Sequence, residues 1–118
     1  MTLNLHWNKC VGDKWCPFLT VNLDHAAFEN KRGVYIIWHG GDHPKTVYVG
    51  QGNIAERIRA HRDEQAILQY SRHGLFVTWA EVSEASMSGV ERFFYDRLTP
   101  LVGDKSPETA HVQASFPW

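Results

Sequence analysis

The sequence predicts an α+β fold: a small three-stranded antiparallel sheet flanked by helices. Three stretches rich in β-branched and aromatic residues indicate the strands, and two stretches with apolar residues at helical spacing indicate the helices. Along the chain the order is strand, strand, helix, strand, helix. This order favours helices packed on one small sheet, because each element must bury its apolar face against another.

The first two strands are expected at residues 33–40 and 46–52, GVYIIWHG and TVYVGQG. The turn-forming stretch GGDHPK joins them, so they should pair as a hairpin. LFVTWAEV, residues 75–82, is the third strand. Near the N-terminus, residues 15–23 could be extended and residues 24–29, DHAAFE, could form a short helical turn.

The first helix is expected to begin at about Ile54 and to run into the sixties. Asn53 is a good N-cap residue, and Glu56 follows three positions later, as in a capping box. Residues advance by about 100° along a helix, so Ile54 and Ile58 lie on one face. These two side chains mark the face that packs inward.

Two charged or titratable residues fall within or beside this inward stripe. They are Arg57 and His61, whereas Arg59 and Arg62 point elsewhere. A charged group on a buried face is costly unless it is paired or solvated in a cleft. Arg57 and His61 therefore call for an explanation that Arg59 and Arg62 do not.

The second helix contains a carboxylate on its apolar face. Ser86 or Ser88 could cap the helix, which continues to about Leu98 and ends before Pro100. Glu91 falls inside the apolar stripe, where a carboxylate is rare without a partner or a metal. The stripe consists of Met87, Val90, Phe94, Leu98 and Leu101.

Two strand tyrosines complete a candidate cluster. Tyr35 and Tyr48 each alternate with two β-branched neighbours and so face away from them. The neighbours are Val34, Ile36, Val47 and Val49. Together with Arg57, His61 and Glu91, the tyrosines could converge on one cleft. Taken singly, each tyrosine could be an ordinary sheet residue, Arg57 and His61 a surface pair, and Glu91 the ion-pair partner of Arg57.

The length and hydropathy of the chain bound its class. The 118 residues amount to one domain, and 43% hydrophobic residues with a mean hydropathy of −0.37 are typical of a globular protein. No apolar run approaches the ~18 residues that span a membrane, and the N-terminus has no apolar stretch of signal-peptide length. We expect a cytoplasmic protein with no membrane partner.

The charge and the cysteines give two further limits. A net charge of −1 and a pI of 6.6 mean that any basic, nucleic-acid-binding surface must be local, and positive side chains do cluster between Arg57 and Arg72. Cys10 and Cys16 are expected to be free thiols in a cytosolic chain. Zinc is the alternative, although no second cysteine pair supplies the remaining ligands.

Four stretches in the chain resemble the GIY-YIG nuclease family. Each tripeptide alone is a weak signal, but the ordered set, with an Arg, a His one turn later and a Glu on a later helix, is specific. The four stretches are GVY at 33–35, YVG at 48–50, NIAERIRAH at 53–61 and GVERFFYDRLTP at 89–100. The resemblance covers about Gly33 to Val102 and implies that residues 1–118 form a single GIY-YIG-like domain with flanking segments.

The resemblance implies a role for each residue of the cluster. Tyr35 and Tyr48 would lie in the active site, one of them as general base or water-positioning group. Arg57 would hold the scissile phosphate, and His61 would assist proton transfer or phosphate contact. Glu91 would bind one divalent cation, Mg²⁺ or Mn²⁺. Phosphodiester hydrolysis builds negative charge that an arginine fork and a hard cation can stabilise.

Neighbouring residues are expected to contact the substrate. They are Gly50, where the backbone can approach a phosphate, with Gln51, Asn53 and Arg59. The chain departs from the family at Gly103, where an Asn is common.

Two functions follow from these observations. The first is a metal-dependent endonuclease acting on DNA, including branched or damaged DNA, aided by a recruiting protein partner. The second is a catalytically weak or inactive module that binds nucleic acid or protein through exposed aromatics, for which Trp7, Trp15 and Trp118 are candidates. Alternatively, these tryptophans close the core at the chain ends.

Overall fold

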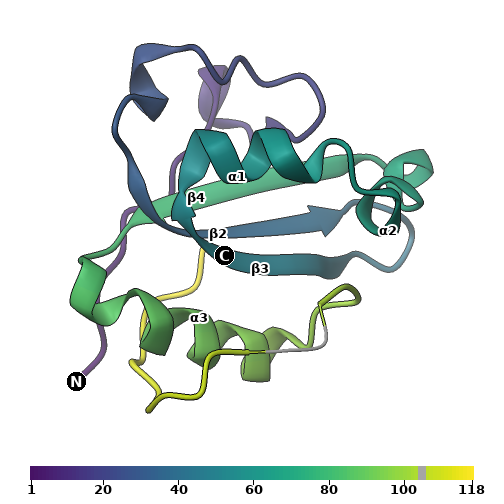
Figure 1. The fold of residues 1–118 in the computed structure, drawn as a ribbon. Coiled ribbons are helices and arrows are strands. Elements are labelled where there is room, and N and C mark those ends of the chain that lie inside the picture. Colours follow the sequence, from purple (N-terminus) through teal and green to yellow (C-terminus); the bar gives the residue numbers. More distant parts are fainter. Residues whose placement is uncertain (104–105) are drawn as a thin grey trace.

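The computed structural model describes residues 1–103 and 106–118 and has an α+β fold (Figure 1). Four antiparallel strands lie in the order β1-β4-β2-β3. The α-helices and strands are β1 (Cys16–Pro17), β2 (Arg32–His39), β3 (Lys45–Asn53), α1 (Ile54–His61), α2 (Gln65–Leu68), β4 (Leu75–Glu81) and α3 (Glu84–Leu98). Short 3₁₀ turns lie at Val11–Asp13, Ala26–Phe28 and Ser71–His73.

The sheet has one strand more than the three expected. The additional strand, β1, pairs Cys16 with Val77 and Pro17 with Phe76 of β4. It was not predicted as a strand of the sheet, because two residues are too few to display the period-2 alternation of a strand. The three longer strands agree with the predicted ranges to within one or two residues.

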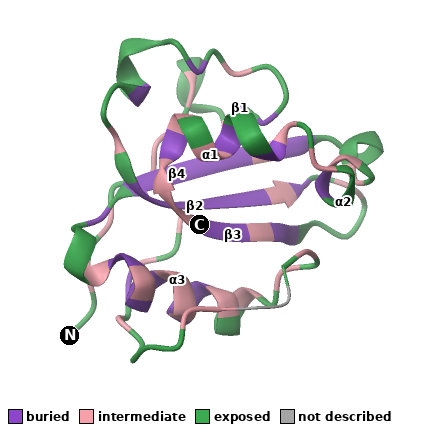
Figure 2. Cartoon of the chain, in the orientation of Figure 1, coloured by how far each residue is buried: buried purple, intermediate pink, exposed green. Residues whose placement is uncertain are grey.

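The two main helices lie on opposite faces of the sheet (Figure 1). On one face, Ile54 and Ile58 of α1 pack with Tyr35 and Ile37 of β2. On the other face, α3 packs against Val34 and its neighbours. Figure 2 shows the strands buried along most of their length and the outer side of α1 exposed. The sequence predicted that Tyr35 faces away from Val34 and Ile36. The structure agrees, and this alternation in β2 separates two apolar clusters.

A β-bulge changes the side-chain directions in β3. The register of β2 and β3 pairs Tyr35 with Gly50 and Ile37 with Tyr48, and then shifts between Ile37 and Trp38. Val47 is the extra residue and packs in the same apolar cluster as Tyr48. The expectation that Tyr48 faces away from Val47 is wrong, because a bulge interrupts strict alternation.

The two main helices have the ends expected, except at the start of α3. Helix α1 ends at His61, and residues 65–68 form the separate helix α2. Helix α3 begins earlier than predicted, with Ser83 at its N-cap position. Leu101 is not part of the apolar face and is 42% exposed, since Thr99 takes a left-handed conformation and ends the helical periodicity before it.

Helix α3 is covered on two sides. One side packs on the sheet, and Phe116 of the C-terminal segment contacts both Phe93 and Phe94 on the other. This second contact buries Phe93, which lies outside the predicted stripe. A Cβ at Gly89 would collide with Val112, so this glycine allows the C-terminal segment to approach the helix closely.

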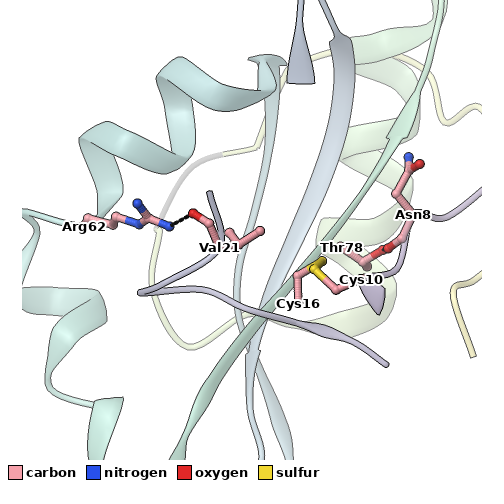
Figure 3. Close-up of a disulfide and its surroundings, with 6 residues drawn as sticks. All are labelled: Asn8, Cys10, Cys16, Val21, Arg62 and Thr78. Atoms are coloured by element: carbon pink, nitrogen blue, oxygen red, sulfur yellow. Dashed lines mark hydrogen bonds between the residues drawn. A yellow bond between two sulfur atoms is a disulfide. The ribbon is translucent and has the colours of Figure 1, made fainter. Parts of the chain in front are cut away.

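The two cysteines form a disulfide, Cys10–Cys16, which corrects the expectation of free thiols (Figure 3). The spacing alone could not reveal it; the pairing depends on β1, which brings Cys16 onto β4 and fixes the preceding loop. Hydrogen bonds tie the same segment to the sheet: Asn8 N–H donates to Trp79 O, and Thr78 Oγ1 donates to Asn8 O.

Within residues 1–103 and 106–118, the structure contains no helix that is both long and apolar enough to cross a membrane.

Candidate active site on the edge strand

The centre of the candidate site is the buried hydroxyl of Tyr35. The side chain is fully buried, and its Oη lies 2.6 Å from His61 Nε2. Gly50 lies opposite Tyr35 in the strand pair, and a Cβ at Gly50 would overlap the tyrosine hydroxyl. The glycine that the sequence associated with phosphate contact therefore has a structural reason of its own: it leaves room for Tyr35.

His61 links this hydroxyl to a carboxylate. Its Nδ1 lies 3.0 Å from Glu64 Oε1. A carboxylate accepts hydrogen bonds, so Nδ1 carries the proton and Nε2 accepts from Tyr35 Oη. Burial lowers the pKa of His61, against the raising effect of Glu64, which favours this neutral form. Tyr35, His61 and Glu64 thus form a hydrogen-bonded chain from the core to the surface.

Tyr48 is the accessible tyrosine of the pair. It is half-buried, its ring centroid lies 6.1 Å from that of Tyr35, and the two rings are stacked. The His61 ring lies closer to it, at 4.4 Å. Burial raises the pKa of Tyr48, and the positive charge of Arg57 opposes this effect. The structure therefore distinguishes two tyrosines that the sequence could not rank.

Arg57 lies beside both tyrosines. It is half-buried, and its side-chain stem passes next to Gly52, where φ is +124°. Burial raises the pKa of Tyr35, and Arg57 lowers it in part. The guanidinium is thus near both phenol groups while part of it reaches solvent, a position from which it can meet an anion.

Glu91 is on α3, on the opposite face of the sheet, and reaches the cluster around the edge strand β3. Gln51 connects β3 to α3: its Nε2 donates to Glu91 Oε2 at 3.1 Å and to Ser88 Oγ at 3.1 Å. Burial raises the pKa of Glu91, with Gln51 and Arg57 lowering it in part. The charge of Glu91 also raises the pKa of Tyr48.

The surroundings of Glu91 fit one divalent cation. Its hydrogen-bond donor, within the described part of the chain, is the neutral amide of Gln51, and Arg57 is the positive charge that acts on this half-buried carboxylate. Mg²⁺ commonly binds through one or two carboxylates, with water and substrate oxygens completing its shell. Among the described residues, no group of three or more His, Cys, Asp or Glu side chains is placed to hold a metal ion. The protein would thus supply a single carboxylate.

Two predicted substrate-binding residues have other partners. The Asn53 side chain accepts a hydrogen bond from Glu56 N–H and caps α1, as the capping pattern predicted. Arg59 forms an exposed ion pair with Asp24, 3.2 Å between Nη2 and Oδ1. Neither side chain contacts the tyrosines in the part of the chain that the structure describes.

Sequence reasoning missed Glu64 and Ser88. Glu64 lies three residues after His61, and this spacing is the signal that could have found it. Ser88 was considered only as a helix cap, whereas it hydrogen-bonds Gln51.

No protein-family profile, no curated protein and no solved structure matches this chain.

Proposed function

We propose that this chain is a metal-dependent endonuclease that hydrolyses phosphodiester bonds in DNA. The observation that carries the proposal is that the charges of Arg57 and Glu91, from helices on opposite faces of the sheet, both act on Tyr48 of edge strand β3, where Gln51 also hydrogen-bonds Glu91 at 3.1 Å. A cation, a phenol and a half-buried carboxylate are costly to gather for packing alone. The GIY-YIG resemblance of the motifs supports the same reaction.

In the proposed reaction, the Arg57 guanidinium binds two oxygens of the scissile phosphate in its planar fork. It neutralises the charge that builds on those oxygens as water attacks. A divalent cation, when bound at Glu91, would stabilise the leaving oxygen. Gln51 holds the Glu91 carboxylate in position by its 3.1 Å hydrogen bond.

Tyr48 is assigned as the group that orients the attacking water and, in its phenolate form, takes a proton from it. Tyr35 is unsuited to that role, because it is fully buried and donates to His61. Tyr48 is half-buried, and a phenol needs neighbouring positive charge to act as a base near neutral pH. Arg57 supplies part of that charge. The chain Tyr35–His61–Glu64 supports the ring of Tyr48 from behind.

The net charge of −1 bears on how the substrate is reached. Non-specific affinity for DNA comes chiefly from phosphate neutralisation, which this chain supplies only locally. We therefore propose a substrate selected by its structure, such as branched or damaged DNA, or delivery by a recruiting protein.

The second candidate is a binding module of the same fold without catalysis. The observation that favours it is the raised pKa of Tyr48, because a less acidic phenol is a poorer base at neutral pH. The two candidates differ in whether cutting occurs.

The experiment incubates the protein with labelled plasmid, duplex, branched and single-stranded DNA and with RNA, in Mg²⁺, Mn²⁺ or EDTA. We expect metal-dependent cutting of at least one DNA form, and its loss in Glu91→Gln. Glu84→Gln is the matched control, since Glu84 lies on the same helix in an exposed ion pair with Arg32. If folded protein cuts none of these substrates with either metal, the binding module is the correct function.

A further inference from the structure

Three tryptophans from distant parts of the chain line one pocket near the C-terminal end of α3. Trp15 comes from the loop closed by the disulfide, Trp38 from β2 and Trp118 from the C-terminal segment. Their rings meet edge to face: the centroid of Trp38 lies 5.3 Å from that of Trp15 and 5.1 Å from that of Trp118. The pocket has a volume of about 720 Å³, within the range of ligand sites.

Trp118 supplies the most open aromatic surface of the pocket. It is 59% exposed, whereas Trp15 and Trp38 are mostly buried. Lys9 lies over the Trp15 ring and Phe76 stacks on Trp38, so a ligand would stack chiefly on Trp118.

The rim of the pocket is cationic. Lys45 and Arg97 are both exposed and line it, and its described lining includes no acidic side chain. The Arg97 guanidinium lies over the ring of Phe93, 5.0 Å from the centroid, which holds it near the pocket. Flat aromatic surfaces with adjacent cations match an unpaired base joined to a phosphate.

The pocket adjoins the candidate active site. Thr46 lines it and precedes Tyr48 by two residues on β3, roughly 7 Å along the strand. Leu98 lines it as well and lies seven residues after Glu91, on the same side of α3 and about 10 Å along the helix axis. Such separations allow one nucleic-acid strand to reach both places.

We propose that this pocket, the tryptophan pocket, binds an unpaired nucleobase of the substrate strand, with Lys45 and Arg97 on the flanking phosphate. The inference rests on the proposed function, because it gives the pocket a place on the same strand that the edge site cuts. It also specifies the substrate class: DNA with an unpaired base beside the scissile bond, as at a branch, a flap or a damaged position.

The test measures binding in EDTA, where no metal-dependent cutting can occur. Two probes are titrated by tryptophan fluorescence and by anisotropy: a short oligothymidylate and an abasic oligomer with the same number of phosphates. We expect the oligothymidylate to bind more tightly and to quench fluorescence. Trp118→Ala should weaken its binding by about tenfold, as for the loss of one stacking partner. Trp118→Phe should retain most of the affinity.

Leu19→Ala is the control variant, because Leu19 is similarly exposed and lies outside the pocket. Arg97→Gln should weaken both probes to a similar degree, because it removes a phosphate contact. Equal affinity of wild-type protein for the two probes, or unchanged binding by Trp118→Ala, overturns the tryptophan pocket as a base site.

The two proposals fail in distinguishable ways. Base-dependent binding without cutting of any substrate supports the base-binding pocket and contradicts the nuclease function. If Glu91→Gln abolishes cutting but the protein shows no preference for the oligothymidylate, the nuclease function is supported and the base-binding pocket is contradicted.

Discussion

At the scale of single residues, the candidate site depends on the hydroxyl of Tyr35. A buried hydroxyl without a partner would cost ~1–3 kcal/mol, and His61 Nε2 provides the partner at 2.6 Å. His61 is itself 1% exposed, and Glu64 orients it from the surface. The hydrogen-bonded chain fixes the ring on which Tyr48 stacks, so it positions the tyrosine that we assign to the reaction.

Gly50→Ala should destabilise the protein and impair cutting. The new methyl group would overlap the Tyr35 hydroxyl, and overpacking of this kind costs about 1–3 kcal/mol. Urea unfolding measures the loss. Gly40→Ala is the control, because its methyl group would meet only the edge of the partly exposed Phe76 ring, which can move. Equal stability of Gly50→Ala and wild-type protein would show that Tyr35 is not held as described.

His61 should make the protein less stable as the pH falls below about 6.5. Burial lowers its pKa in the folded state from the ordinary value of 6.5. Between that value and the lower folded pKa, the unfolded chain binds a proton that the folded chain does not, so acid favours unfolding. The slope for one such group reaches about 1.4 kcal/mol per pH unit.

The measurement compares the free energy of unfolding of wild-type protein and His61→Gln between pH 5 and pH 8. The difference between the two profiles isolates the contribution of His61 to the pH dependence of stability. His39 also destabilises the fold in acid, because burial lowers its pKa, whereas Glu91, whose pKa is raised, has the opposite effect on stability. His43→Gln, at an exposed turn residue, should keep the wild-type slope. A slope that His61→Gln leaves unchanged would contradict a buried neutral imidazole.

The site residues could be predicted only as far as local periodicity reaches. The inward positions of His61 and Glu91 follow from helical spacing, because the neighbouring apolar residues mark the buried side. The link from Gln51 to Glu91 does not follow, since it joins a strand to a helix on the opposite face through tertiary contact. For the same reason the sequence could not rank Tyr35 and Tyr48: their exposure depends on what α1 covers.

At the scale of elements, β3 is the strand that links the residues of the candidate active site. It carries Tyr48, Gly50 and Gln51, and its end caps α1 through Asn53. Its outer edge is partly covered, because Leu101 N–H donates to Thr46 O and Val102 N–H to Val47 O. Gly103 follows this pairing and lies against the Tyr48 ring. Gly103 is thus beside the tyrosine that we assign as the base.

The disulfide loop is the element that sequence reasoning missed, and it allows a separate prediction. Replacing Cys10 and Cys16 by serine should lower the free energy of unfolding by about 2 kcal/mol, as expected for a short closed loop. It should also free Trp15 and weaken oligothymidylate binding. The measurements are urea unfolding and the fluorescence titration. A reducing agent should lower wild-type stability to that of the variant and leave the variant unchanged. Equal stability of the variant and of the wild-type protein without reducing agent contradicts the bridge.

The longer elements were predictable because local sequence determines them. Strands β2, β3 and β4 combine β-branched and aromatic residues with turn formers at their ends, and Asn53 sets the start of α1. Strand β1 and the β-bulge were not predictable, since each arises from pairing between distant segments. The early start of α3 shows that several closely spaced serines leave the cap position undetermined, since Ser83, Ser86 and Ser88 are all candidates.

At the scale of the whole molecule, the sheet separates two apolar clusters, and the candidate site lies at edge strand β3, beyond the part of that edge that Leu101 and Val102 cover. Tyr35, Tyr48 and Arg57 lie with α1, whereas Glu91 and the tryptophan pocket lie with α3. A nucleic-acid strand laid along β3 would meet Arg57, Glu91 and the tryptophan pocket. In the proposed function, this arrangement gives a chain of net charge −1 a local site for a phosphate backbone.

The most direct test of the nuclease is the initial rate of Mn²⁺-dependent cutting by Arg57→Ala, measured beside Arg32→Ala on the best DNA substrate. Arg57 contacts the scissile phosphate in the proposed reaction, so its loss should slow cutting by about 100-fold or more. Arg32 is exposed and pairs with Glu84, so its loss should change the rate less than about twofold. Similar rates for the two variants, with both proteins folded, would contradict an active site at Arg57.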